Sequence, residues 1–82
     1  MTLDIEDTIL FRLLFSNNGF AVGLSRESLE VGFPEDAIQH VPISLDELLK
    51  EHLVKKTDDN KFRLNVDRLE DIERRLKLDS VF

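Results

Sequence analysis

The chain has 82 residues, a net charge of −6 and no cysteine. This length suits a single small domain over residues 1–82 with one modest core. The lack of cysteine excludes disulfides, zinc–thiolate centres and thiol catalysis. Asp4, Glu6 and Asp7 stand where a signal peptide would carry basic residues, so we expect no signal peptide. No apolar run is long enough to cross a membrane, and we expect a cytoplasmic protein.

A first helix is expected over residues 1–18. Its core-facing residues repeat at helical spacing and comprise Ile5, Ile9, Leu10, Leu13 and Leu14. Phe11 and Phe15 form a second apolar row on the same helix. Small domains seldom expose contiguous apolar patches, which favours a core position for this row. The alternative is that Phe11 and Phe15 contact a partner.

Short elements are expected next. Residues 20–22 alternate and can form a short strand. Ser25 can cap a short helix that runs through Val31.

Two prolines shape the segment 32–43. Pro34 is suited to the first position of a further helical turn. Pro42 disfavours helical geometry at Val41, so we expect an extended break there. The segment is therefore predicted to be irregular.

The next helix is predicted to begin at Ser44. Ser44 and Glu47 have the S-x-x-E spacing of a capping box, in which each side chain binds a backbone N–H of the first turn. Apolar residues at helical spacing continue to Leu53, where the expected helix ends.

A β-hairpin and a last helix should follow. Residues 53–57 and 61–65 are the expected strands, because they mix β-branched, aromatic and cationic residues on either side of the turn formers Asp58-Asp59-Asn60. Asp67 can cap a final helix over residues 68–78. That helix offers acid-to-base pairs at i,i+4 spacing, among them Glu70–Arg74 and Asp71–Arg75.

The segment from Leu49 through Leu53-Val54 to Phe62-Arg63-Leu64 resembles the end of the third helix and the wing of a winged helix-turn-helix domain. In that family a glycine, a Leu-Val pair, two charged residues and a turn precede an aromatic–x–Leu strand. Two residues depart from the pattern. His52 replaces the glycine, so the helix end would form without that left-handed residue, and Pro42 interrupts the expected start of the recognition helix.

The resemblance covers about a quarter of the chain. It implies an α+β, mostly helical fold with three to four helices, a small antiparallel sheet in which a strand at residues 20–22 pairs with the wing, and a last helix. A helical bundle without a wing is the alternative fold.

Few residues suggest a catalytic or metal-binding site. No set of nucleophile, base and orienting group is visible, and His40 and His52 lie twelve residues apart without a metal-ligand motif. The run Asp58-Asp59-Asn60 lacks a calcium-loop pattern, because Phe62 and Arg63 stand at its fifth and sixth positions. We therefore expect no enzymatic activity, no metal and no cofactor.

Charge is distributed unevenly. Residues 1–52 carry three Lys/Arg against ten Asp/Glu, whereas residues 53–77 carry eight against six. The candidate nucleic-acid contacts are the cations of the wing and of the third helix: Lys55, Lys56, Lys61, Arg63 and Lys50. The alternative role for the wing cations is protection of an edge strand from aggregation.

The third helix also carries Asp46, Glu47 and Glu51, which would be repelled by phosphates. These acids, together with Phe11 and Phe15, are the candidate partner-binding residues.

Two functions follow. The resemblance favours a small transcriptional regulator, acting as a dimer and contacting duplex DNA through its wing. The alternative is an acidic protein-interaction module, an adaptor or inhibitor of a basic partner, that does not read DNA.

Overall fold

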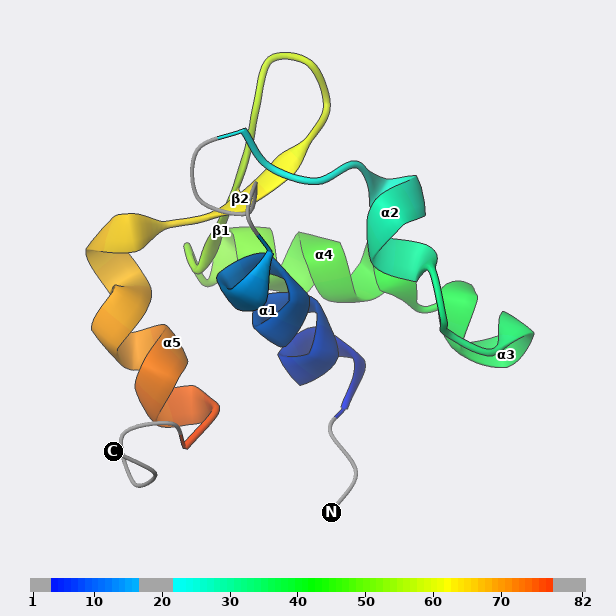
Figure 1. Ribbon diagram of the computed structural model, residues 1–82, viewed down its shortest axis with the longest axis horizontal. Coiled ribbons are helices and arrows are strands. Elements are labelled where there is room, and N and C mark those ends of the chain that lie inside the picture. Colours follow the sequence, from blue (N-terminus) through cyan, green and yellow to red (C-terminus); the bar gives the residue numbers. More distant parts are fainter. Residues whose placement is uncertain (1–3, 17–21, 78–82) are drawn as a thin grey trace.

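The computed structural model describes residues 4–16 and 22–77 (Figure 1). The elements follow in the order α1 (Ile5–Phe15), α2 (Arg26–Glu30), α3 (Glu35–Ile38), α4 (Val41–Lys50), β1 (Val54–Lys56), β2 (Phe62–Leu64), the 3₁₀ turn η1 (Val66–Arg68) and α5 (Leu69–Arg75). The α+β, mostly helical fold with a small antiparallel sheet and a C-terminal helix is confirmed.

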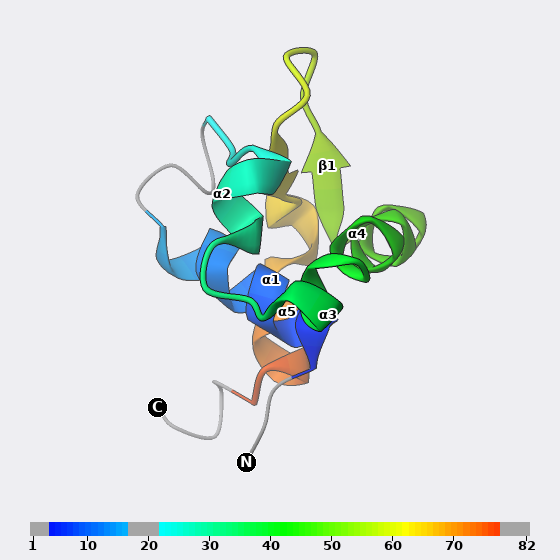
Figure 2. The same ribbon diagram turned by 90° about the vertical axis from the view of Figure 1, so that its right-hand side faces the viewer.

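Helix α1 lies at the centre, with α4 packed against it and α5 on the side away from α2 and α3 (Figure 1). The hairpin stands out from the helices at the end opposite the start of α1 and the end of α5 (Figure 2). The buried core draws on most of the elements and comprises Ile9, Leu10, Leu13, Leu29, Val41, Leu45, Leu48, Leu53, Val54, Phe62, Leu64 and Ile72.

Helix α1 buries the predicted row and exposes the second one. The backbone N–H of Asp7 donates to Asp4 Oδ1 (2.7 Å), which caps the helix. The expected ends at residues 1–3 and 17–18 lie outside the described residues. The expectation that Phe11 and Phe15 are core residues is wrong: they are 40% and 59% exposed, because α4 packs on the other side of α1.

Ser25 caps α2 as predicted, since its hydroxyl accepts from the Ser28 N–H (3.2 Å). Pro34 stands one position before α3, as its N-cap residue. The end of α2 is tied to α1 by Arg12, whose guanidinium donates to the carbonyls of Leu29 and Val31. The same guanidinium lies over the ring of Phe33, 4.7 Å from its centre.

Helix α4 begins three residues earlier than predicted, at Val41, and the extended break before Pro42 does not occur. Pro42 sits in the first turn, where its missing N–H leaves no helical hydrogen bond unmade. Ser44 is a buried residue inside the helix, and its N–H donates to the His40 carbonyl (2.9 Å). The predicted capping box at Ser44 is therefore wrong.

His52 adopts the left-handed conformation itself, with φ 63°. Its N–H donates to the Leu49 carbonyl, and the Leu53 N–H donates to the Leu48 carbonyl. These two bonds form a Schellman motif. The expectation that the helix would end without a left-handed residue is therefore wrong. His52 takes the left-handed conformation that glycine usually supplies.

Strands β1 and β2 pair antiparallel, with Val54 opposite Leu64 and Lys56 opposite Phe62. The predicted hairpin is confirmed with shorter strands than expected. A third segment joins it at Leu24, which exchanges two backbone hydrogen bonds with Phe62 (2.7 and 2.8 Å). Of the strand expected at residues 20–22, the first two residues lie outside the described part of the chain.

The last helix starts later than predicted. The Asn65 side-chain oxygen accepts from the Asp67 N–H and caps η1, whereas α5 begins after Arg68 with no side-chain cap, so the predicted cap at Asp67 is wrong. The Glu70–Arg74 pair forms (3.2 Å). The predicted Asp71–Arg75 pair does not, because Arg75 turns toward α1 and the end of α4.

Candidate nucleic-acid interface

The hairpin has two chemically different faces. Val54 and Leu64 are opposite each other and buried, so they anchor one face in the core. Lys55 and Arg63 are opposite each other on the other face, since successive side chains alternate across a strand. Lys56 returns to the first face, beside Phe62, but lies beyond the core and is exposed.

Three hairpin cations have no acidic partner within the described residues. Among residues 4–16 and 22–77, Lys55, Lys56 and Arg63 form no ion pair, and two of them face each other directly across the ladder. Like charges opposite each other destabilise a hairpin. An anion bound there would relieve this repulsion.

The other two predicted DNA contacts are already paired. Lys61 lies 3.8 Å from Asp59, and Lys50 lies 3.6 Å from Glu47. The described part of the structure thus divides the five predicted cations into three without an acidic partner and two with one.

The hairpin turn is held by a small polar network. The Thr57 hydroxyl donates to Asp59 Oδ1 (2.5 Å) and accepts from the Lys61 N–H (3.0 Å). The hydrogen bond from Thr57 is the main reason that the pKa of Asp59 is lowered. Asn60 occupies the left-handed region at φ 63°, as expected of a turn former. A well-defined turn therefore joins the two strands that carry the cations.

The outer face of α4 carries Ile43, Asp46, Glu47 and Lys50. Ile43 is 60% exposed, and Asp46 has no cationic partner among the described residues. This face offers acid and apolar surface where a base-reading helix would offer Arg, Lys, Asn or Gln.

The remaining predicted partner residues are placed differently. Glu51 is exposed but is already paired with Arg75 (3.0 Å), which ties it to α5. Phe11 and Phe15 lie on α1 with their ring centres 4.5 Å apart. The structure does not gather the five predicted partner residues into one surface.

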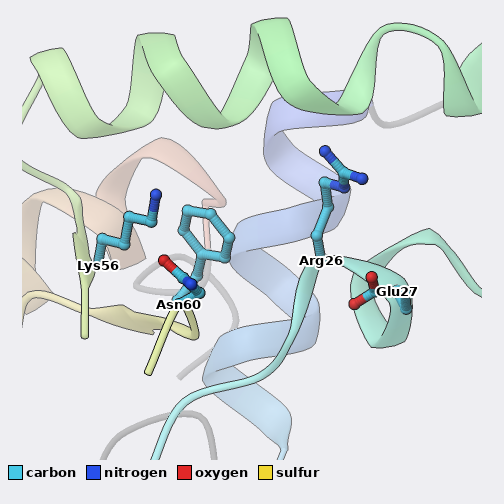
Figure 3. Close-up of a pocket in the computed structure, with 5 residues that line it drawn as sticks. Arg26, Glu27, Lys56 and Asn60 are labelled. Atoms are coloured by element: carbon cyan, nitrogen blue, oxygen red, sulfur yellow. The ribbon is translucent and has the colours of Figure 1, made fainter. Parts of the chain in front are cut away.

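A pocket missed by the sequence analysis lies between the hairpin and the start of α2 (Figure 3). It has a volume of about 260 Å³ and is lined by Arg26, Glu27, Lys56, Asn60 and Phe62. Lys56 and Asn60 enter from the hairpin, and Arg26 and Glu27 enter from α2 (Figure 3). The bridge between Leu24 and Phe62 brings these distant segments together. The resemblance implied a strand at residues 20–22 paired with the wing, but the bridge at Leu24 and the pocket beside it were not predicted.

A second pocket, of about 400 Å³, is lined by Asp4, Ile5, Glu6, His40 and Ser44. In the described part of the chain no three His, Asp or Glu side chains gather as a metal site requires. None of the helices described is long and apolar enough to cross a membrane.

Comparison of this chain with protein-family models, with curated proteins and with solved structures found no match.

Proposed function

We propose that this protein is a small, non-enzymatic, winged-helix regulator that contacts duplex DNA through its hairpin. One observation carries the proposal: the described cations that lack any partner, Lys55, Lys56 and Arg63, are all on the hairpin. The order of elements supports the winged-helix assignment, since a helical segment leads directly into the hairpin and a third strand segment pairs with it at Leu24.

Electrostatics explains why a phosphate backbone suits these residues. Each phosphate that a Lys or Arg neutralises releases condensed counterions, which favours binding at low salt. The net charge of −6 opposes DNA over most of the molecule. We therefore expect contact to be centred on the hairpin and to be modest in affinity.

A cytoplasmic location and action as a dimer belong to the same proposal. The exposed Phe11–Phe15 pair supports a dimer, because it is apolar surface that a second copy could cover.

The test is a titration of a labelled duplex with purified protein at several salt concentrations. The double substitution Lys55→Gln with Arg63→Gln should weaken binding about tenfold at low salt and lower the salt dependence by about two counterions. Lys50→Gln is the control, because it removes one charge from an α4 residue that Glu47 already pairs. If Lys50→Gln, which removes one charge against two, lost half as much binding free energy as the double variant, only net charge would matter and contact through the hairpin would be contradicted.

A second candidate function rests on the outer face of α4. Its acids and the exposed Ile43 support an interaction module for a basic protein, with no reading of DNA.

The double substitution Asp46→Asn with Glu47→Gln separates the two functions. For the DNA regulator we expect tighter duplex binding, by about threefold, because two repelling charges are removed. If the protein is instead an interaction module, we expect duplex binding to stay undetectable and the affinity for a basic model peptide to fall. The measurements are duplex anisotropy and peptide calorimetry on the same preparation.

A further inference from the structure

The pocket between the hairpin and α2 combines two cations from segments thirty residues apart, Arg26 and Lys56. We propose that this pocket binds one phosphate group of a nucleic-acid backbone. The inference rests on the proposed function and deepens it, because it places a DNA contact on α2, outside the hairpin.

The lining chemistry favours an anion. The Lys56 ammonium has no acidic partner among the residues that the structure describes, and the residue opposite it in the ladder is Phe62, whose ring makes an apolar wall. A charge beside an apolar wall is screened less than one in open water. The Asn60 amide adds neutral N–H donors at the turn.

Arg26 can serve the pocket while keeping its own ion pair. Its Nε lies 3.3 Å from Glu30, and its side chain is about half exposed. A guanidinium has five N–H donors in a fork, so the pair with Glu30 leaves donors available to a phosphate. The ends of Arg26 and Lys56 extend toward the same side of the pocket (Figure 3).

Backbone contacts hold together the two segments that carry the cations. Leu24, two residues before Arg26, is bonded in both directions to Phe62, which pairs with Lys56. Because these bonds fix the segments before any ligand arrives, binding requires little further ordering of the chain. Phosphate recognition at this pocket thus follows from how the third segment joins the hairpin.

Glu27 also lines the pocket and opposes an anion. Neutralising Glu27 should therefore change the affinity in the opposite direction from neutralising a cation. If a phosphate binds there, Glu27→Gln must strengthen binding while Arg26→Gln and Lys56→Gln weaken it.

The experiment measures duplex anisotropy across a salt series for these variants. Arg26→Gln and Lys56→Gln should each weaken binding about threefold and lower the salt dependence by about one counterion. The double variant should lose less than the product of the two, because both residues contact one phosphate. Arg74→Gln is the matched control: it also breaks an exposed i,i+4 ion pair, on α5, and should leave binding unchanged.

Two results separate failure of the phosphate site from failure of the proposed function. If Lys55→Gln with Arg63→Gln weakens binding while Arg26→Gln matches Arg74→Gln, the inference fails and contact through the hairpin stands. If the wild-type protein binds no duplex, the proposed function fails. A titration with inorganic phosphate, followed by nuclear magnetic resonance, then tests whether the pocket binds phosphate at all. Shifts of the Asn60 side-chain amide that vanish in Arg26→Gln would support a site for free phosphate; no shift would overturn it.

Discussion

At the residue scale, His52 adopts an unfavourable backbone conformation at the end of α4. It is held at φ 63°, where a side chain crowds the backbone and costs about 1–2 kcal/mol. Its carbonyl accepts from the Asn65 side-chain amide (2.8 Å), which fixes the residue in place. The fold therefore uses a left-handed residue here although the sequence supplies no glycine.

Replacing His52 by glycine should stabilise the protein. We expect a gain of about 1 kcal/mol, since the strain relieved exceeds the added entropy of the unfolded chain. Urea unfolding followed by circular dichroism measures it. Asn60→Gly is the control at the same φ, and because Asn tolerates this region its gain should be smaller. A lower urea midpoint for His52→Gly would show that the imidazole makes a contact that stabilises the protein by more than the strain costs.

Residue-scale energies also explain why α4 starts before its predicted cap. A capping side chain contributes about 1 kcal/mol. Burying a valine contributes about 1.5–3 kcal/mol, and Val41 is fully buried. Because burial of Val41 stabilises the protein more than a cap at Ser44 would, the helix extends back to Val41 and Ser44 becomes an interior residue. The capping pattern is visible in the sequence, whereas the burial of Val41 depends on how α4 packs on α1.

At the element scale, Gly23 allows the third segment to reach the hairpin. A Cβ at this position would lie 2.8 Å from the Phe62 carbonyl oxygen, and the backbone has φ +90°. Both conditions exclude other residues unless the segment moves. The pairing of Leu24 with Phe62 depends on this glycine.

Gly23→Ala should therefore separate the segment from the hairpin and cost about 3 kcal/mol, from strain together with weakened backbone hydrogen bonds. Amide hydrogen exchange at Leu24 and Phe62 should accelerate beyond the global loss of stability. Gly32→Ala is the matched control, since its φ is +87° but its nearest neighbour is the flexible end of Arg12, 3.1 Å away. Equal effects of the two substitutions would mean that φ alone decides, and that the close approach to Phe62 is unimportant.

The elements show what local patterns can predict. Helical spacing identified the buried row of α1, and alternation identified the hairpin, because each pattern is set within one element. The exposure of Phe11 and Phe15 depends on which side of α1 its neighbours cover. The Arg26–Lys56 pocket likewise depends on a pairing between distant segments. Neither could be predicted from one element alone.

At the scale of the whole molecule, Arg75 joins three helices. Its guanidinium contacts Glu6 (3.1 Å) and Asp7 (2.7 Å) of α1, and Glu51 (3.0 Å) just after α4. Burial by itself lowers the pKa of Arg75, but the hydrogen bonds to Asp7 and Glu6 outweigh it, so the pKa is raised. Because the pKa of Arg75 is higher in the folded protein, its charge stabilises the fold at every pH below the ordinary pKa of arginine. This stabilisation is lost only as the pH rises through the raised pKa of the folded protein. Arg75 thus stays charged throughout the neutral range.

Arg75→Met should destabilise the protein by about 2 kcal/mol, between the effects of exposed and buried ion pairs, because Arg75 is half-buried. Methionine keeps an apolar stem, so the loss reports the charge and its hydrogen bonds. Urea unfolding measures it. Arg74→Met is the control: Arg74 pairs with Glu70 and Asp71 on its own helix, and its loss should cost less than about 0.5 kcal/mol.

The same variant tests whether α5 depends on this contact. Without Arg75, three carboxylates lie close together with no shared cation, so they should repel one another between α1 and the end of α4, while α5 loses its contact with both. Adding Glu51→Gln to Arg75→Met should then recover part of the loss, because it removes one of the repelling charges. Amide exchange should accelerate more in α5 than in α4, since α4 keeps its packing on α1. Uniform acceleration, with no recovery from Glu51→Gln, would mean that Ile72 and its apolar neighbours hold α5 without help from Arg75.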